Sequence, residues 1–236
     1  MKIALLGYGR MGKEIEKIAL QRGHDIVLKV EEEQAYDISV ADVAIDFSVP
    51  SAAFSNITNC FENRVPVVSG TTGWLEKYEE ALESCKKHEG AFIYASNFSL
   101  GVNIFFELNK QLSLLMNALE DYNVSIEEIH HTKKLDAPSG TAITLAEGII
   151  EHSHKTSWEL QAEHVQTKDS LIPITAKRIP EVPGTHIISY HSNVDSIEIK
   201  HTAHNRQGFA LGAVIAAEWL VNKVGIYSMK DVLNIH

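Results

Sequence analysis

The sequence predicts an α/β protein of two domains, the first built on a parallel sheet and the second an α+β domain with a mixed, open sheet. Over the first hundred residues, short apolar runs alternate with helical patterns, which is typical of parallel sheets with crossover helices. From residue 100 onward, strands follow one another with turn signals between them. A length of 236 residues agrees with one or two domains and suffices for a core without disulfides or metals.

The first domain is expected to contain five strands joined by helices. The expected strands are Lys2–Leu6, Asp25–Val30, residues 42–47, residues 65–68 and Ala91–Tyr94. The expected helices cover residues 11–22, 50–63 and 74–87. Gly23 suits the end of the first helix and Pro50 the start of the second. Residues 31–41 are short and acidic, and leave little room for a crossover helix.

The second half carries longer helices and successive strands. The expected helices cover residues 101–119, 139–152, 210–221 and Met229–Leu233. The expected strands cover residues 124–131, 172–178, 186–192 and 196–202, with turns at 182–184 and 193–195. The predicted division assigns residues 1–98 and 207–236 to the first domain and residues 99–206 to the second.

Composition excludes several classes of protein. The formal net charge of −10 opposes binding to a phosphate backbone, so we expect no nucleic-acid partner. No apolar run approaches the roughly 20 residues that span a bilayer, and the apolar N-terminal stretch is too short for a signal peptide. The two cysteines, Cys60 and Cys85, form no CxxC pair and are expected to be reduced. Together these features predict a cytoplasmic protein.

A GxGxxG motif lies directly between the first strand and the first helix. Its residues are Gly7, Tyr8, Gly9, Arg10, Met11 and Gly12. The first glycine permits a tight turn, the second lets the backbone approach a pyrophosphate, and the third allows close packing of helix on strand. The helix N-terminus attracts the anion. The motif therefore predicts a Rossmann-type dinucleotide site, with a purely structural glycine turn as the alternative.

An acidic residue is expected about 20 residues after this motif, where it accepts a hydrogen bond from a ribose 2′-hydroxyl. Glu31 or Glu32 occupies this place at the end of the second strand. Because an acid there repels a 2′-phosphate, the run from Glu31 to Glu33 favours NAD over NADP, although Glu33 fits a solvated loop better. Arg10 and Lys29 could still accommodate a phosphate.

The second candidate site is a basic segment that begins at the end of the strand over residues 124–131. It contains His130, His131, Lys133 and Lys134 in an otherwise acidic chain. Histidine, with an unperturbed pKa of about 6.5, can donate or accept a proton at neutral pH. This cationic segment suits a carboxylate substrate. The alternative is an exposed basic loop with no ligand.

The start of the following helix adds a second anion-binding feature. Ser139 follows Pro138 and suits an N-cap position. The backbone N–H groups of Gly140 and Thr141 then have no partner within the helix and can bind an anion.

Two pairs of histidines, His152 with His154 and His201 with His204, could suggest metal binding. Zinc sites need three or four converging ligands, and these pairs lie on separate elements without an HExxH motif. No metal is expected.

Taken together, these motifs resemble the 4-hydroxy-tetrahydrodipicolinate reductase (dihydrodipicolinate reductase) family of lysine and diaminopimelate biosynthesis. The similarity covers nearly the whole chain, and its most specific part is the segment HHTKKLDAPSGTA, residues 130–142. The other matching positions are the glycine motif, Asp46, Phe47, Ser48, Pro50, Gly70 to Gly73, Ser96 to Ser99, Gly101 to Asn103, Glu128, Pro183 to His186, His201, Arg206, Phe209, Ala210, Gly212 and Ala213.

The resemblance implies a role for each matching site residue. It makes His130 the acid/base histidine and Lys134 the proton donor. Substrate binding falls to His131, Ser139, Gly140 and Thr141, and nucleotide contacts to Gly70, Thr71, Thr72, Ala95, Ser96, Asn97 and Phe98. The implied reaction reduces the ring of a cyclic dicarboxylate imine with NADH or NADPH. The usual form of the family is a cytoplasmic homotetramer, with residues 99–206 binding substrate and building the oligomer.

Two departures leave the cofactor preference open. Longer members carry an extra glycine in the first loop and a helix after the second strand, and Glu32 replaces an arginine that often follows the acid. Two other functions are alternatives to the reductase. One is another two-domain Rossmann dehydrogenase that acts on an amino acid or a sugar, although a neutral sugar would not need the histidines and lysines of the basic segment. The other is a nucleotide sensor without enzymatic activity, which would not need proton donors such as His130 and Lys134.

Overall fold

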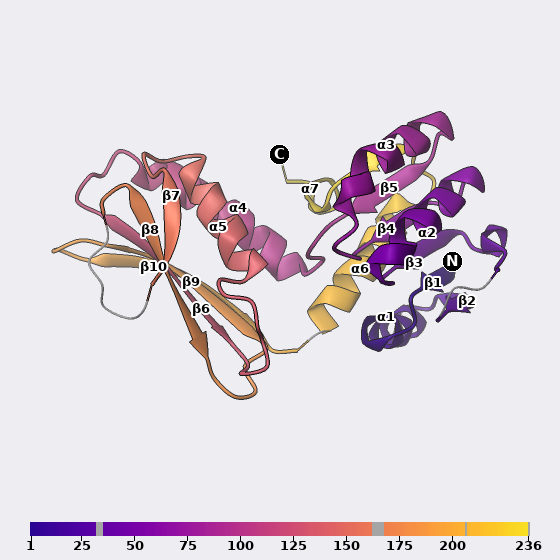
Figure 1. Ribbon diagram of the computed structural model, residues 1–236, viewed down its shortest axis with the longest axis horizontal. Coiled ribbons are helices and arrows are strands. Elements are labelled where there is room, and N and C mark those ends of the chain that lie inside the picture. Colours follow the sequence, from indigo (N-terminus) through magenta and orange to yellow (C-terminus); the bar gives the residue numbers. More distant parts are fainter. Residues whose placement is uncertain (32–34, 162–167, 206, 236) are drawn as a thin grey trace. The chain divides into compact units, whose positions relative to one another are not determined.

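The computed structural model describes residues 1–31, 35–161, 168–205 and 207–235. The chain divides into two compact units, here called unit 1 (Met1–Asn103 and Arg206–His236) and unit 2 (Ile104–Asn205). Figure 1 shows their elements. Among the described residues, no helix combines the length and the apolarity needed to cross a lipid bilayer.

Unit 1 is built on a parallel sheet of six strands in the order β11-β5-β4-β3-β1-β2. The strands are β1 (Lys2–Leu6), β2 (Asp25–Val30), β3 (Val43–Asp46), β4 (Val67–Ser69), β5 (Ala91–Tyr94) and β11 (Gly225–Tyr227). The order reverses direction between β1 and β3, and such a switch point is where doubly wound sheets bind ligands, at the carboxyl ends of the strands. The predicted Rossmann-like sheet is confirmed.

Helices cover both faces of this sheet. They are α1 (Arg10–Gln21), α2 (Pro50–Glu62), α3 (Tyr78–Lys87), α6 (Gln207–Leu220) and α7 (Met229–Leu233). Alternate residues of β1 belong to two cores: Ile3 and Leu5 pack with α1 and α6, whereas Ala4 and Leu6 pack with α2 and α3. A strand buried on both faces reads as a continuous apolar run, which explains the sequence of β1.

Two elements of unit 1 differ from the expectation. The strand β11 was not predicted, because its three residues carry no periodic pattern. The helix expected over residues 74–87 begins with a 3₁₀ turn, Leu75–Lys77, before α3. Between β2 and β3 the described residues contain a 3₁₀ turn, Ile38–Val40, in agreement with the short connection.

Unit 2 holds a mixed sheet of five strands in the order β10-β9-β6-β8-β7. The strands are β6 (Asn123–His130), β7 (Ser157–Gln161), β8 (Leu171–Arg178), β9 (Gly184–His191) and β10 (Ser196–Ala203). β8 runs parallel to β6 and β7, whereas β9 is antiparallel to β6 and β10. The predicted mixed sheet is therefore confirmed. β7, which is largely exposed, was not predicted.

Two helices, α4 (Leu100–Met116) and α5 (Gly140–Ile150), cover one face of this sheet. Val124 and Ile126 of β6 pack against them. Because side chains of a strand alternate between faces, Glu128 and His130 lie on the same face, beyond the apolar core. Both side chains are buried. The buried residues at the start of β6 are therefore apolar, and those at its carboxyl end are polar.

Candidate active site

The three glycines of the GxGxxG loop have different surroundings in unit 1. Gly7 has a φ of +93°, and a Cβ there would lie 2.2 Å from the Phe47 carbonyl oxygen. A Cβ on Gly12 would lie 2.4 Å from the Gly7 oxygen, so this glycine permits the contact between α1 and the loop. Around Gly9, which caps α1, a Cβ would meet no described atom within 4 Å. The second glycine therefore leaves open space at the helix N-terminus, as close approach of a pyrophosphate requires.

A cavity of about 700 Å³ lies beside this loop. It is lined by Gly7, Tyr8, Gly9, Val30, Glu31, Ala35, Tyr36, Phe47, Ser48, Val49, Ala52, Ser55, Asn56 and Asn59. These residues follow the carboxyl ends of β1, β2 and β3 or belong to α2, so the cavity occupies the switch point of the sheet. Its size and place fit part of a dinucleotide. Glu31 is exposed at its edge, whereas Glu32, Glu33 and Arg206 lie outside the described residues.

Lys29, a candidate for contact with a cofactor phosphate, forms an ion pair within unit 1. Its ammonium lies 2.5 Å from Glu16 Oε1 and donates to the Tyr8 hydroxyl at 3.3 Å. The Tyr8 hydroxyl also donates to Glu16. The hydrogen bond from Lys29 is the main cause that lowers the pKa of the Glu16 carboxyl. In this structure, the charge of Lys29 is balanced by Glu16, while Arg10 is exposed at the start of α1.

A buried carboxylate, Asp46, connects the loops that follow β3 and β4. It accepts hydrogen bonds from Ser48 Oγ at 2.6 Å, Ser69 Oγ and Thr71 Oγ1 at 2.8 Å, and Asn56 Nδ2 at 3.2 Å. Burial raises the pKa of Asp46, and these four donors oppose that effect. Asp46 is one of the positions that match the family, but no role was predicted for it from the sequence.

The predicted nucleotide-binding residues after β4, Gly70 to Thr72, differ in how far they are buried. Gly70 packs against Phe47, whose ring would lie 2.3 Å from a Cβ at this position. Thr71 is buried, and its hydroxyl donates to Asp46 and accepts from the Ser48 N–H at 2.8 Å. Its carbonyl accepts from Trp74 at 2.8 Å. The Thr71 side chain thus holds the loop, while Thr72 is exposed and free to meet a ligand.

The predicted nucleotide-binding residues of the loop after β5 also differ in how far they are buried. Ser96 is exposed and Ala95 and Asn97 are half-buried, whereas Phe98 is fully buried in the core, 5.8 Å from the Phe47 ring. Asn97 Oδ1 accepts a hydrogen bond from the Ser99 N–H at 2.9 Å. The Phe98 side chain therefore stabilises the loop. Of the motif residues, Met11 is half-buried and packs against the same core.

In unit 2, the carboxylate of Glu128 is the centre of a buried polar cluster. We call Glu128, His130, Ser139, Arg178 and His186 the Glu128 network. Both carboxylate oxygens accept from the Ser139 N–H at 3.1 Å, and Oε1 accepts from Arg178 Nη2 at 3.2 Å. Oε2 lies 3.4 Å from His130 Nδ1 and 3.7 Å from His186 Nε2. The sheet register brings these groups together, because Glu128 is opposite His186 and His130 is opposite Arg178.

The network fixes the charge of its members. Burial opposes ionisation of Glu128, but the bonds from His186 and Ser139 outweigh it and lower the pKa of Glu128 to about 2. For His130, burial is the largest cause and lowers its pKa to about 4; Glu128 raises the pKa, and His186, Lys134 and Arg178 lower it. At neutral pH, Glu128 is therefore an anion and His130 a neutral imidazole.

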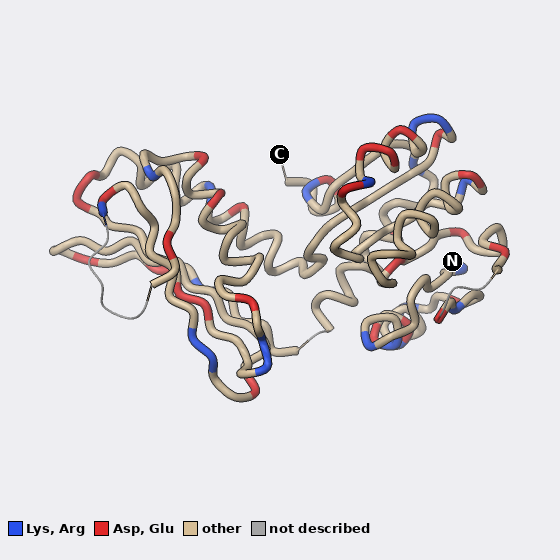
Figure 2. Tube along the Cα trace, in the orientation of Figure 1, with Lys and Arg blue, Asp and Glu red and all other residues tan. Residues whose placement is uncertain are grey.

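The residues predicted to act with His130 follow it in the chain. His131 and Lys134 are half-buried, and Lys134 Nζ donates to Asp136 Oδ2 at 2.7 Å. Arg178 Nη2 donates to the carbonyl oxygen of Asp136 at 2.6 Å, which ties this loop to β8. Figure 2 shows Lys and Arg gathered at one end of the unit 2 sheet.

The start of α5 has the predicted cap. Ser139 Oγ accepts from the Ala142 N–H at 3.2 Å and lies 3.1 Å from His186 Nε2. Gly140 is exposed and Thr141 half-buried, so the first N–H groups of the helix are accessible. The structure thus brings the predicted substrate residues of α5 next to His130 through Glu128.

Two family models match this chain. The model described as dihydrodipicolinate reductase, N-terminus, matches residues 29–98, and the one described as dihydrodipicolinate reductase, C-terminus, matches residues 101–233. The chain belongs to the dihydrodipicolinate reductase family. This confirms the resemblance seen in the sequence.

Relatives agree with membership in this reductase family, and a solved structure shares the fold. A protein of Christiangramia forsetii named 4-hydroxy-tetrahydrodipicolinate reductase is 60% identical over 99% of this chain and 98% of its own. One of the same name from Methanoregula boonei is 34% identical over 96% and 92%. Among solved structures, dipicolinate-bound dihydrodipicolinate reductase from Paenisporosarcina sp. TG-14 has a TM-score of 0.79 at 24% identity, covering 100% and 99% of the chains. That structure shows the shared fold.

Three buried residues of this reductase could in principle hold a metal ion. Ligand atoms of Glu128, His130 and His186 lie within 4.8 Å of one another. Arg178 binds the same carboxylate and would repel a cation, and His186 is within hydrogen-bonding distance of Ser139. We interpret the group as a cluster of polar side chains around the Glu128 carboxylate, and the absence of a metal stays a prediction.

Three members of the Glu128 network were not predicted as site residues. Glu128 and His186 were only matching positions of the family, and Arg178 was the end of an expected strand. Arg178 and His186 are distant from residues 130–142 in sequence, so the signal lies in strand pairing, which one sequence does not reveal.

Proposed function

We propose that this protein reduces 4-hydroxy-tetrahydrodipicolinate to tetrahydrodipicolinate with NADH or NADPH, a step of lysine and diaminopimelate biosynthesis. The observation that carries the proposal is the clustering of a buried carboxylate, a neutral histidine and the capped start of α5 next to a lysine-bearing loop, in a chain of this reductase family. Loss of the 4-hydroxyl group as water and addition of one hydride and one proton balance the reaction.

Unit 1 is proposed as the dinucleotide-binding domain. The open space at Gly9, the accessible start of α1 and the cavity edged by Glu31 support binding of the pyrophosphate and of a ribose hydroxyl. The bound cofactor supplies the hydride. We propose that Gly70, Thr72 and the backbone around Ser96 contact it, while Thr71 and Phe98 hold their loops in place.

Unit 2 is proposed as the substrate domain. A carboxylate of the substrate is bound by the N–H groups of Gly140 and Thr141 and the Thr141 hydroxyl, with Ser139 and His131 beside them. The half-buried N-terminus of α5 and the cationic side chains of the loop support this assignment, because both attract a dianion.

Lys134 is proposed as the group that protonates the reduced ring. His130, with its pKa lowered by burial to about 4, holds no extra proton at neutral pH in the ligand-free protein, which favours Lys134 as the donor. Its ammonium must leave Asp136, and a bound carboxylate can replace that partner. His130 then acts as a neutral imidazole beside the substrate, with its Nδ1 3.4 Å from Glu128 Oε2.

Freshly generated 4-hydroxy-tetrahydrodipicolinate with NADH or NADPH tests this function. We expect oxidation of the cofactor that depends on the substrate. A protein that leaves NADH and NADPH unoxidised with this substrate, but oxidises or reduces an amino acid or a sugar from a panel, would contradict the proposal.

A cytoplasmic homotetramer is the proposed form. The helices α4 and α5 cover one face of the unit 2 sheet, and the described residues of unit 2 place no helix on the other face, which supports assembly through the sheet. Cys60 and Cys85 are both free and buried, as expected for a reducing compartment. Sedimentation tests the assembly, with only a 26.2 kDa species at micromolar concentration as the contradicting result.

A further inference from the structure

We propose that Glu128 is a positioning residue that orients both halves of the substrate site, the carboxylate-binding start of α5 and the loop that carries Lys134. The inference rests on the proposed function. Glu128 is fully buried and its oxygens are engaged by groups from three other elements. Two separate chains of contacts, called here the helix branch and the loop branch, lead from it toward the substrate.

The helix branch runs from Glu128 through Ser139 and His186 to α5. Both carboxylate oxygens accept from the Ser139 N–H at 3.1 Å, and His186 Nε2 lies 3.7 Å from Oε2 and 3.1 Å from Ser139 Oγ. Ser139 is the residue that caps α5, so its position sets the direction of the next N–H groups. Glu128 and His186 therefore hold the cap residue from its backbone and from its side chain.

The loop branch runs from Glu128 through Arg178 to Asp136 and Lys134. One nitrogen of Arg178, Nη2, donates both to Glu128 Oε1 at 3.2 Å and to the Asp136 carbonyl at 2.6 Å. The Asp136 side chain in turn accepts from Lys134 Nζ at 2.7 Å. The buried carboxylate thus fixes, through Arg178, the backbone of the residue that holds the lysine.

The buried charge of the Glu128 carboxylate is stabilised by the groups that donate hydrogen bonds to it. An unpaired buried charge is strongly unfavourable, whereas one that accepts several hydrogen bonds is stabilised and gives each donor a fixed direction. The three partners of Glu128 come from β8, β9 and the start of α5, which approach one another in this fold through the sheet register. A neutral side chain of equal size cannot accept from all of them, so both branches depend on the charge.

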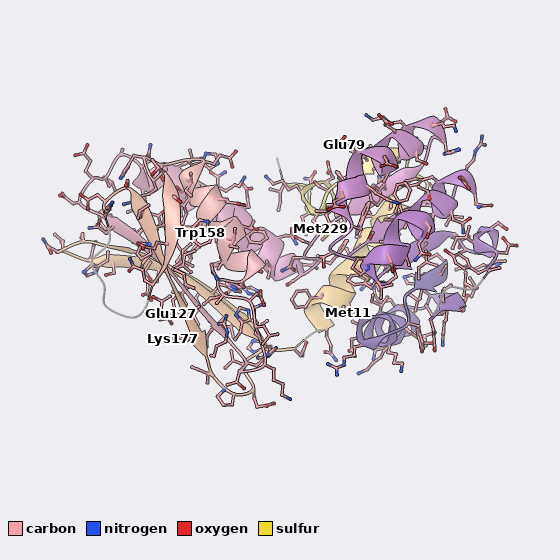
Figure 3. The ribbon with its side chains drawn as sticks, in the orientation of Figure 1. Met11, Glu79, Glu127, Trp158, Lys177 and Met229 are labelled. Carbon is pink, nitrogen blue, oxygen red and sulfur yellow. The ribbon has the colours of Figure 1, made fainter. Side chains whose placement is uncertain are left out.

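Three variants separate the two branches. Glu128→Gln keeps the volume but replaces an acceptor oxygen with a donor. His186→Leu removes the His186 contacts of the helix branch, and Arg178→Lys keeps the charge but loses the guanidinium whose Nη2 contacts both Glu128 and Asp136. The matched control is Glu127→Gln. Glu127 precedes Glu128 on the opposite face of β6 and pairs with Lys177 at 2.7 Å, as labelled in Figure 3.

For each variant, kcat and KM are measured with the substrate, and Kd with NADH and with pyridine-2,6-dicarboxylate, a stable cyclic dicarboxylate. We expect His186→Leu to raise KM and the dicarboxylate Kd roughly tenfold or more, with kcat little changed, because a charged hydrogen bond or a small displacement has effects of this order. Arg178→Lys is expected to lower kcat by a similar factor and to leave the dicarboxylate Kd unchanged. Glu128→Gln is expected to change both, and Glu127→Gln neither.

Thermal unfolding distinguishes positioning from loss of the fold. If Glu128→Gln is unfolded, the separate effects of His186→Leu on KM and of Arg178→Lys on kcat still carry the test. Equal changes of KM and kcat in these two variants, or wild-type values in Glu128→Gln, would overturn the inference. Failure of the wild-type protein to reduce the substrate would instead contradict the proposed function, while the dicarboxylate Kd of His186→Leu and Glu128→Gln would still decide the helix branch.

Discussion

The imidazole of His130 lies against the backbone of Gly184, where a Cβ would come within 3.1 Å of Nε2 and 3.3 Å of Cδ2. β6 and β9 are paired, and Gly184 begins β9 opposite the end of β6 where His130 lies. The absence of a side chain at Gly184 therefore leaves the space that the His130 ring occupies. This explains in physical terms why a glycine stands in the segment Pro183 to His186.

Gly184→Ala is expected to displace the His130 ring by a few tenths of an ångström and to lower kcat roughly tenfold, since small misplacements at a reacting site are costly. NADH affinity should not change, because the substitution lies in unit 2. Steady-state kinetics and cofactor titration measure both. Gly208→Ala is the control, because its Cβ would meet Ser99 Oγ only at 3.7 Å. Equal turnover in the two variants would contradict the argument.

Lys134→Ala is expected to lower kcat by about 10²–10⁴-fold, the usual contribution of a positioned proton donor. The variant removes both the donor and a charge that the dianion meets. His130→Gln should also slow turnover while it keeps a hydrogen-bonding side chain. NADH should bind both variants as it binds the wild type. Lys133→Ala, at an exposed neighbouring lysine, is the control. If Lys134→Ala kept wild-type turnover, the prediction would be contradicted, and the loop would be a basic surface without a catalytic role.

Thr141→Val is expected to weaken substrate binding with little change of cofactor affinity. The substitution keeps the shape of the half-buried side chain and removes its hydroxyl. A hydrogen bond to a charged group contributes about 1.5–3 kcal/mol, so KM should rise roughly 10-fold to 100-fold. Kinetics over a range of substrate concentrations measure the effect, and an unchanged KM would remove the hydroxyl from the carboxylate site.

Much of the fold is encoded locally and could be predicted. The apolar run of β1, the glycines that follow it and the amphipathic α1 each indicate their element without knowledge of the rest of the chain. β7 and β11 could not be found in this way, because β7 is mostly exposed and β11 is three residues long. Both are edge strands of their sheets, where pairing with one neighbour replaces periodicity as the defining feature.

The candidate site was predicted in part for the same reason. His130, Lys134 and Ser139 are close in sequence and can be recognised as candidate site residues from their residue types. Arg178 and His186 reach the site through strand pairing, which a single sequence does not reveal. Phe98 and Thr71 were expected to contact the cofactor, and this stays a prediction. The Phe98 side chain lies in the core and the Thr71 hydroxyl donates to Asp46, so their side chains support the loops.

Cofactor preference is expected to depend on Glu31. This carboxylate lies at the edge of the cavity beside the glycine loop, and Lys29 is paired with Glu16. NADH should therefore bind at least as tightly as NADPH. Glu31→Gln removes the charge that would repel a 2′-phosphate and should improve NADPH binding relative to NADH. Fluorescence titration of both cofactors with both proteins measures this, and a strong wild-type preference for NADPH would contradict it.

Stability toward acid should depend on His130, whose pKa is about 4 in the folded protein because the ring is buried. Unfolded histidine has a pKa of about 6.5, so the unfolded chain takes up a proton first as the pH falls. The contribution of His130 to stability is therefore complete above about pH 6.5 and is lost as the pH falls toward about 4. Glu128, with a folded pKa of about 2, loses its contribution only below the unfolded glutamate pKa of about 4.3.

Urea unfolding at about pH 7 and about pH 5 isolates the histidine, since this window lies above the titration of Glu128. Each pH unit below the unfolded pKa costs about 1.4 kcal/mol, so the wild type should lose about 2 kcal/mol through His130. His130→Gln carries no proton-binding ring and should lose about 2 kcal/mol less over the same interval. His201, whose pKa is also lowered by burial, contributes equally to both proteins and cancels in the comparison. Identical pH dependence in the two proteins would mean that His130 is not held neutral in the folded state.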